Sequence, residues 1–65
     1  MTKEILNRLP ETIRLHIDEL KKNYNNPNIN LNVSRAGSIQ YLTGLMDAGL
    51  ITEVEKRTLF CYTTI

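Results

Sequence analysis

The chain contains one histidine, His16, and the residue best placed to bind a metal ion together with it is Glu19. In a helix, residues three apart lie on the same face, so this imidazole and this carboxylate can point toward a common ion. They supply at most half of a metal site, because such sites use three or four protein ligands. We therefore expect His16 to lie on a helix surface beside an apolar stripe, and we expect no bound metal.

Cys61 is the only cysteine. A thiol acts as a nucleophile when a base such as histidine lies within hydrogen-bond distance. Nothing in the sequence brings Cys61 close to His16, and the three glycines do not form a phosphate-binding motif. We expect Cys61 to be a small buried hydrophobic residue. The sequence thus predicts a protein without catalytic activity and without a cofactor.

Small residues recur at helical spacing in the middle of the chain. Gly37, Tyr41, Gly44 and Ala48 follow one another at intervals of 4, 3 and 4 residues, which places them on one helix face. Small side chains on such a face let a second backbone come close, and Tyr41 can act as an amphipathic anchor. Two interpretations are open: these four residues contact a partner or a second copy, or they receive the first helix of the same chain.

One segment supports a different function. The stretch "SRAGSIQYLTGLMDAGLI", residues 34 to 51, resembles the recognition helix of winged-helix DNA-binding proteins, in which a serine-led helix ends in an acidic-Ala-Gly-Leu-Ile turn. The following "TEVEKR" departs from that family, because it has no glycine and no hairpin turn for a wing. The resemblance implies a helix-turn-helix-like element, and the residues assigned to DNA contact under this alternative are Arg35, Ser38, Gln40, Lys56 and Arg57.

The overlapping stretch "LTGLMDAGLITEVEK" is also similar to the helical hairpin of short C-terminal oligomerisation domains. That resemblance implies self-association instead of nucleic-acid binding.

A first helical region is indicated by apolar residues spaced three or four apart, namely Leu6, Leu9, Ile13, Ile17, Leu20 and Tyr24. Pro10 interrupts it, because proline has no N–H to donate and its ring clashes with the preceding turn. We expect a short N-terminal turn capped by Thr2, a break, and a main helix from about Pro10 to Asn23. Asp18 and Lys22 are spaced to pair on that helix.

The next stretch, "NNPNINLNVS", is rich in asparagine, which disfavours the interior of helices and strands. Ile29, Leu31 and Val33 alternate with polar residues, so an extended chain would place all three on one side. We expect residues 28 to 33 to be extended, with that side buried against the helices.

Two further helices follow in the prediction. Ser34 or Ser38 caps the first of them, and Gly49 ends it in a left-handed conformation. Its expected buried stripe is Ile39, Leu42, Leu45 and Met46. Thr52 and Glu55 have capping-box spacing and predict a helix from about 53 to 62, although the composition of "TLFCYTTI" favours a strand. The fold class is therefore mainly α: one domain over residues 1–65, with three helices and one extended segment near 28–33.

Composition reduces the number of function classes that fit this chain. Eight Lys and Arg oppose seven Asp and Glu, for a net charge of +1, whereas DNA-binding domains usually carry a basic patch or stripe. A single cysteine excludes an internal disulfide and is typical of a reducing compartment. No apolar run approaches the roughly 20 residues that span a bilayer, and the first ten residues lack the apolar core of a signal peptide. We expect a cytoplasmic protein without membrane contact.

A chain of 65 residues buries a small core, and domains of this size often gain stability from self-association. We expect a non-catalytic interaction or regulatory module that binds an unidentified protein partner through a helical face and forms a homodimer. Small chains of this kind are often encoded by phages or mobile elements. The alternative is a small DNA-binding transcriptional regulator.

Overall fold

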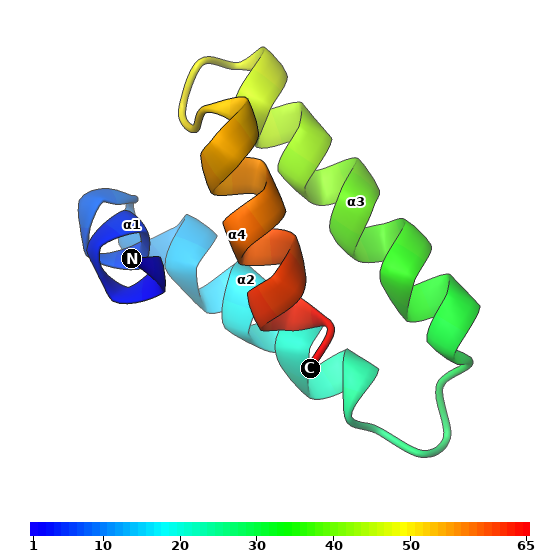
Figure 1. The fold of residues 1–65 in the computed structure, drawn as a ribbon. Helices are drawn as coiled ribbons and strands as arrows, with labels where there is room; N and C mark the ends of the chain where they lie inside the picture. Colours follow the sequence, from blue (N-terminus) through cyan, green and yellow to red (C-terminus); the bar gives the residue numbers. More distant parts are fainter.

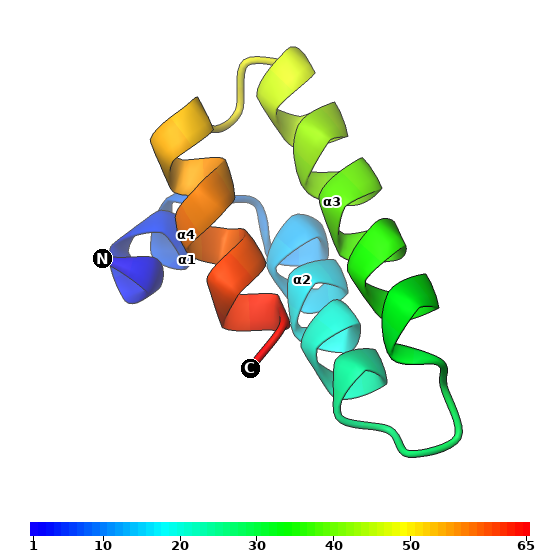
Figure 2. The same ribbon diagram turned by 45° about the vertical axis from the view of Figure 1, so that its right-hand side comes forward.

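The computed structural model describes all residues from 1 to 65 and contains helices without strands. The helices are α1 (Thr2–Arg8), α2 (Glu11–Tyr24), α3 (Leu31–Asp47) and α4 (Glu53–Thr63). α2, α3 and α4 lie side by side, with α3 antiparallel to the other two, and α1 packs against α4 on the side away from α3 (Figures 1 and 2). The prediction of a mainly helical chain is confirmed, but there are four helices instead of three.

The predicted break at Pro10 is confirmed. Leu9 is extended, with φ −81° and ψ 150°, because the ring of a following proline disfavours the helical conformation. Pro10 then stands at the N-cap of α2, where its carbonyl accepts hydrogen bonds from Ile13 and Arg14. The prediction that Thr2 caps the first helix is wrong. The helix starts one residue earlier, since the carbonyl of Met1 already accepts from the N–H of Ile5 at 3.1 Å.

The asparagine-rich stretch differs most from the expectation. Asn30 is the N-cap of α3, and its Oδ1 accepts hydrogen bonds from the N–H groups of Asn32 at 2.8 Å and Val33 at 3.3 Å. Upstream, Asn26 Oδ1 accepts from the N–H of Asn28 at 2.9 Å and so forms a turn. The predicted extended segment at 28–33 is therefore wrong, because asparagine side chains pair with the backbone and start a helix.

The burial predicted for this stretch is wrong for the same reason. Side chains two residues apart on a helix point in directions that differ by about 200°, so Leu31 and Val33 do not lie on the same side. Leu31 is 48% exposed and Val33 64% exposed, while Ile29 is half-buried. Truncating Leu31 should accordingly remove much less stability than truncating Leu42, which is fully buried.

The prediction that Ser34 or Ser38 caps α3 is wrong. Both serines lie inside the helix, because Asn30 begins it upstream. Both serines face the interior, and neither hydroxyl has a hydrogen-bond partner. The buried stripe of α3 continues through Leu42 and Leu45, two of the four residues predicted for it. Of the other two, Ile39 is 38% exposed and Met46 is half-buried, because the helix directs Ser34 and Ser38 into the bundle instead.

The two predicted helix-terminus signals around the α3–α4 loop are confirmed. Gly49 has a φ of +77° and donates to the carbonyl of Met46 at 2.9 Å, while Leu50 donates to that of Leu45 at 3.0 Å. This is the Schellman arrangement, in which a left-handed residue pairs the last carbonyls of a helix. Thr52 and Glu55 then form the capping box that begins α4. Residues 53–63 are helical, so the capping signal outweighs the β-propensity of the sequence.

The core is built from all four helices and the α3–α4 loop. Its fully or nearly buried apolar residues are Ile5, Leu9, Ile17, Leu42, Leu45, Ile51 and Leu59. Ile5 belongs to α1, and Leu9 follows directly after it; α1 covers one end of the α2–α4 pair. None of the helices has the length and apolar character needed to cross a membrane.

Candidate functional site: the outer face of α3

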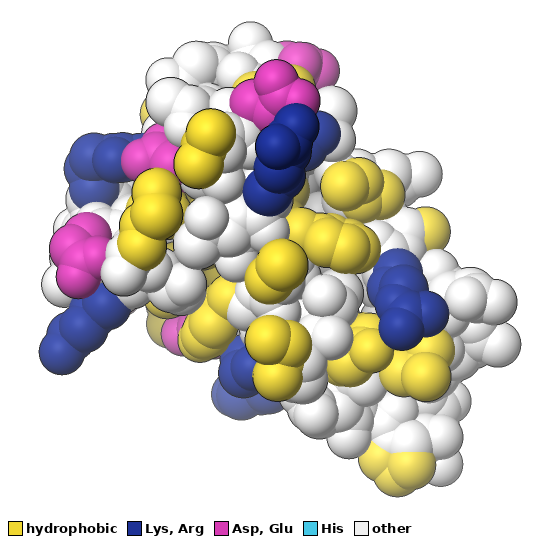
Figure 3. Space-filling view, in the orientation of Figure 1, with side chains coloured by type: hydrophobic (Ala, Val, Ile, Leu, Met, Phe, Trp, Pro, Cys, Tyr) yellow, Lys and Arg dark blue, Asp and Glu magenta, His cyan; other side chains and the backbone are white.

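The distribution of charge singles out α3. This helix of 17 residues contains only two charged side chains, Arg35 and Asp47. The shorter α2, with 14 residues, carries six. Figure 3 views the molecule from the α4 side, and acidic side chains there lie over α1 and around the α3–α4 loop, while the surface along α3 is mainly apolar or uncharged. Depletion of charge is the compositional signal that marks the centre of protein interfaces.

One flank of α3, beside the stripe that packs into the bundle, is formed by residues three or four apart. We define this outer face as Val33, Gly37, Gln40, Gly44 and Ala48. All are exposed except Gly37, which is half-buried. The face contains no charged residue. It includes three of the four residues predicted to bind a partner.

No atom of the chain fills the space that a side chain would occupy at the two glycines of the outer face. A Cβ built on Gly37 or on Gly44 would meet no atom within 4 Å. The interpretation that this face receives the first helix of the same chain therefore has no contact to support it at either glycine. The space beside both glycines is open to another molecule.

Tyr41, the fourth predicted partner-binding residue, lies at the edge of this face and turns toward α2. Its ring stacks on the imidazole of His16, with the centroids 4.1 Å apart and the planes inclined by 22°. Partial burial raises the pKa of the Tyr41 hydroxyl. His16 is exposed, as predicted, and the chain has no group of three or more His, Cys, Asp or Glu residues arranged to hold a metal ion. The stack fixes the relative position of α2 and α3 beside the outer face.

The residues predicted for DNA contact on α3 have different environments. Arg35 is exposed, but its guanidinium lies over the ring of Tyr24, 5.7 Å from the centroid, and Nη2 donates to the Tyr24 hydroxyl at 3.2 Å. Ser38 is fully buried and points into the bundle, so it does not face a ligand on the surface. Gln40 is exposed on the outer face.

The structure does not bring the predicted basic residues together. Lys56 is half-buried, and Arg57 pairs with Glu53 at 3.3 Å, both in the first turns of α4. Arg35 lies near the start of α3, at the end far from the beginning of α4 because the two helices are antiparallel (Figure 1). No continuous basic surface connects these positions.

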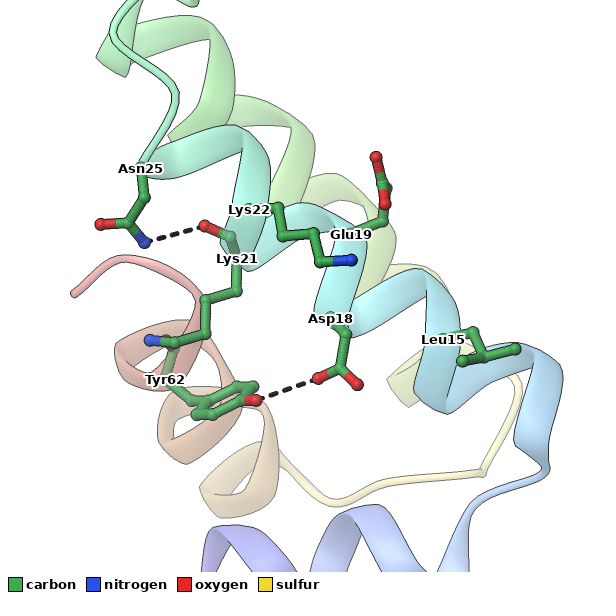
Figure 4. Close-up of a pocket in the computed structure, with 7 residues that line it drawn as sticks. All are labelled: Leu15, Asp18, Glu19, Lys21, Lys22, Asn25 and Tyr62. Carbon is green, nitrogen blue, oxygen red and sulfur yellow. Dashed lines mark hydrogen bonds between the residues drawn. The ribbon is translucent and has the colours of Figure 1, made fainter.

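A pocket of about 570 Å³ opens between α2 and the end of α4 (Figure 4). Its polar groups are largely paired with each other. The Tyr62 hydroxyl donates to Asp18 Oδ1 at 2.9 Å, and Lys21 Nζ donates to the Tyr62 carbonyl at 2.9 Å. The predicted ion pair of Asp18 with Lys22 is absent, and this carboxylate accepts a hydrogen bond from Tyr62. Burial, together with the hydrogen bond and charge of Asp18, raises the pKa of Tyr62. These contacts dock α4 onto α2.

Cys61 is exposed, so the prediction of a buried thiol is wrong. On α4 it lies two residues from both Leu59 and Thr63, which are buried, and two residues of helix turn a side chain to the opposite side.

Val33 and Gln40 belong to the outer face but were not among the residues predicted to bind a protein partner, and Gln40 was predicted only for DNA contact. The signal that could have indicated them is the scarcity of charge between positions 31 and 47, read together with helical spacing. Comparison with protein-family models, curated proteins and solved structures finds no match to this chain.

Proposed function

We propose that this protein is a non-catalytic interaction module that binds a protein partner through the outer face of α3. The observation that carries the proposal is an exposed helix face without charge, with two glycines whose outward sides are open. A helix on the surface of a small domain ordinarily presents charged and polar residues to water. The outer face of α3 instead has the composition of a surface that is covered when the protein works.

The glycines strengthen this interpretation. Glycine in the middle of a helix lowers stability by about 0.5–1 kcal/mol relative to alanine. Internal packing does not require it here, since an added Cβ at Gly37 or Gly44 would touch nothing. A partner backbone that approaches α3 closely would make the missing side chains useful. Val33 and Ala48 would then supply apolar contact at the two ends of the face.

We do not extend the proposal to DNA binding. A protein binds DNA largely by neutralising phosphates with Lys and Arg. Here Arg35 is engaged with Tyr24, Arg57 is paired with Glu53, and the outer face of α3 is uncharged. A regulatory role is compatible with the proposal, because such a module changes the state of a larger protein by occupying one of its surfaces.

The test is affinity capture from the native cell with tagged wild-type protein and two variants. Gly44→Leu adds bulk to the outer face at a position where the fold has room for it. Asn7→Leu, on the exposed surface of α1, adds the same side chain elsewhere and controls for nonspecific adhesion. We expect a protein that is retained by the wild type and by Asn7→Leu and is lost with Gly44→Leu. Equal retention by all three, or by none, would overturn the proposal.

A further inference from the structure

Large apolar side chains lie on the flank of α3 opposite to the outer face. Leu31 is 48% exposed, Ile39 is 38% exposed, and Met46 is half-buried and packs against the core. Each follows the one before it by about two helical turns, so the three form one row along the helix. The row lies on the side of α3 next to α4, because Tyr41, on the other side of the buried stripe, stacks on His16 of α2.

Phe60 adds an apolar side chain from α4. Tyr62 of α4 donates a hydrogen bond to Asp18 of α2. Side chains two residues apart on a helix point to nearly opposite sides, so Phe60 lies on the α3 side of α4, where it is half-buried against the core. Figure 3 shows apolar side chains gathered between these two helices. We define the α3–α4 face by its apolar residues, which are Leu31, Ile39, Met46 and Phe60.

A positive charge lies toward each end of the α3–α4 face. Arg35 is exposed and stands midway between Leu31 and Ile39, four residues from each, and so belongs to the same row. Lys56 lies four residues before Phe60, near the start of α4. Because α3 and α4 are antiparallel, the two cations stand at opposite ends of the face (Figure 1). Neither forms an ion pair with an acidic residue of the chain.

The acidic residues nearest to this face do not offset these charges. Glu53 already pairs with Arg57 at 3.3 Å. Asp47 follows the last residue of the row, and successive side chains on a helix differ in direction by about 100°, so it lies outside the row. Arg35 keeps N–H groups for a ligand, because one hydrogen bond to Tyr24 leaves donors of its guanidinium unused. The face is thus apolar at its centre and positive at both ends.

We infer that the α3–α4 face binds an amphipathic helix of a partner protein that has acidic residues near both of its ends. This surface is separate from the outer face, so the inference goes beyond the proposed function and does not rest on it. An apolar surface between two helices accepts a third helix through side chains at positions i, i+4 and i+7. Ile39 and Met46 are seven residues apart, about 10 Å, which matches the i to i+7 distance of such a helix. Carboxylates at its two ends then lie near Arg35 and Lys56.

The same charges argue against a second copy of this chain as the occupant. In a two-fold pair the same surface of both copies meets itself. The two cations of one copy, Arg35 and Lys56, would then meet the same two cations of the other. An acidic helix instead brings opposite charge to both ends, which speeds encounter and determines how the helix is positioned along the face.

Selection from a displayed peptide library tests this inference. The peptides are about 16 residues long, enough for roughly four helical turns, with apolar residues at i, i+4 and i+7 and either Glu or Lys near each end. We expect the wild type to enrich peptides with Glu at both ends. The double variant Arg35→Glu, Lys56→Glu should enrich Lys at those positions instead. A selection that enriches no peptide with the wild type, or the same charge preference for both proteins, would overturn the inference.

The affinity of the selected acidic peptide locates its contact on the protein. Fluorescence anisotropy with the labelled peptide should give a dissociation constant at least about tenfold higher for Ile39→Glu than for the wild type, because a charge then lies in the apolar centre. Val54→Glu is the matched control, since Val54 is 59% exposed and lies outside the face, and circular dichroism checks that both variants remain helical. Equal affinity of these two variants would contradict binding at this face.

Gly44→Leu separates this inference from the proposed function. That variant adds bulk to the outer face, on the other flank of α3, and should bind the selected peptide as tightly as the wild type does. A loss of peptide binding in Gly44→Leu would place the peptide on the outer face and overturn the inference while leaving the proposed function standing.

Discussion

Arg8 and Glu55 form a two-point ion pair between the end of α1 and the beginning of α4. Nη1 of the guanidinium donates to Oε2 at 2.7 Å, and Nη2 donates to Oε1 at 2.8 Å. Oε1 also accepts the N–H of Thr52 at 2.9 Å, which closes the capping box of α4. The Glu55 carboxylate thus caps the N-terminus of α4 and also binds α1 through Arg8.

This pair makes the stability of the fold depend on pH. Hydrogen bonds, first from Arg8 and then from the Thr52 backbone, lower the pKa of Glu55 from 4.5 to about 2. A carboxyl whose pKa is lower in the folded state stabilises the fold above its unfolded pKa and loses that contribution as the pH falls toward the folded value. We expect the melting temperature to fall between about pH 5 and pH 2, because protonation of Glu55 removes the pair.

Glu55→Gln tests this assignment. Thermal melts followed by circular dichroism should show a lower melting temperature at pH 7 and a weaker decline toward pH 2 than in the wild type. Glu53→Gln is the matched control, since Glu53 pairs with Arg57 on the exposed surface. A pH profile of Glu55→Gln with the same slope as the wild type would show that other carboxylates cause the acid sensitivity.

Asn30→Ala should lower the free energy of unfolding by about 1 kcal/mol, because its side chain pairs two N–H groups at the start of α3. Asn32→Ala is the control. Its side chain is exposed and makes no hydrogen bond. Urea denaturation of both variants measures the difference. If the two variants unfolded at the same urea concentration, the cap at Asn30 would not contribute in solution.

Ser38→Ala should raise the free energy of unfolding by about 1 kcal/mol, since it removes a buried hydroxyl that has no partner and places a better helix former in α3. Thr63→Val is the contrast, because the buried Thr63 hydroxyl donates to the Phe60 carbonyl at 3.2 Å and its loss should bring no gain. Urea denaturation measures both. A loss of stability in Ser38→Ala would mean that a partner such as a buried water satisfies the hydroxyl.

Pro10, Gly49 and the Thr52–Glu55 pair could be interpreted correctly from the sequence because each acts within four residues. Proline removes a donor, a left-handed glycine pairs the last carbonyls of a helix, and a capping box pairs the first N–H groups of the next. None of these needs a contact from elsewhere in the chain. They determine where α2 and α4 begin and where α3 ends.

The start of α3 shows where such local information is insufficient. Asn30, Ser34 and Ser38 are all residue types that cap helices, and the sequence does not rank them. The alternation of polar residues with Leu31 and Val33 indicated an extended chain, whereas the cap at Asn30 indicated a helix. The cap determined the structure. Once Asn30 begins the helix, the two serines fall on its buried side.

The sequence by itself determined the helical class, the break at Pro10, the end of α3 and the beginning of α4. Only the tertiary structure decided which sides of those helices are covered. Helical spacing alone places Gly37 and Gly44 on one face. Whether another part of the chain covers that face depends on the position of α2. His16 of α2 stacks on Tyr41, but no atom of the chain fills the space beside either glycine. Capping is a matter of hydrogen bonds between residues close in sequence, whereas burial depends on residues that the fold brings from distant parts of the chain.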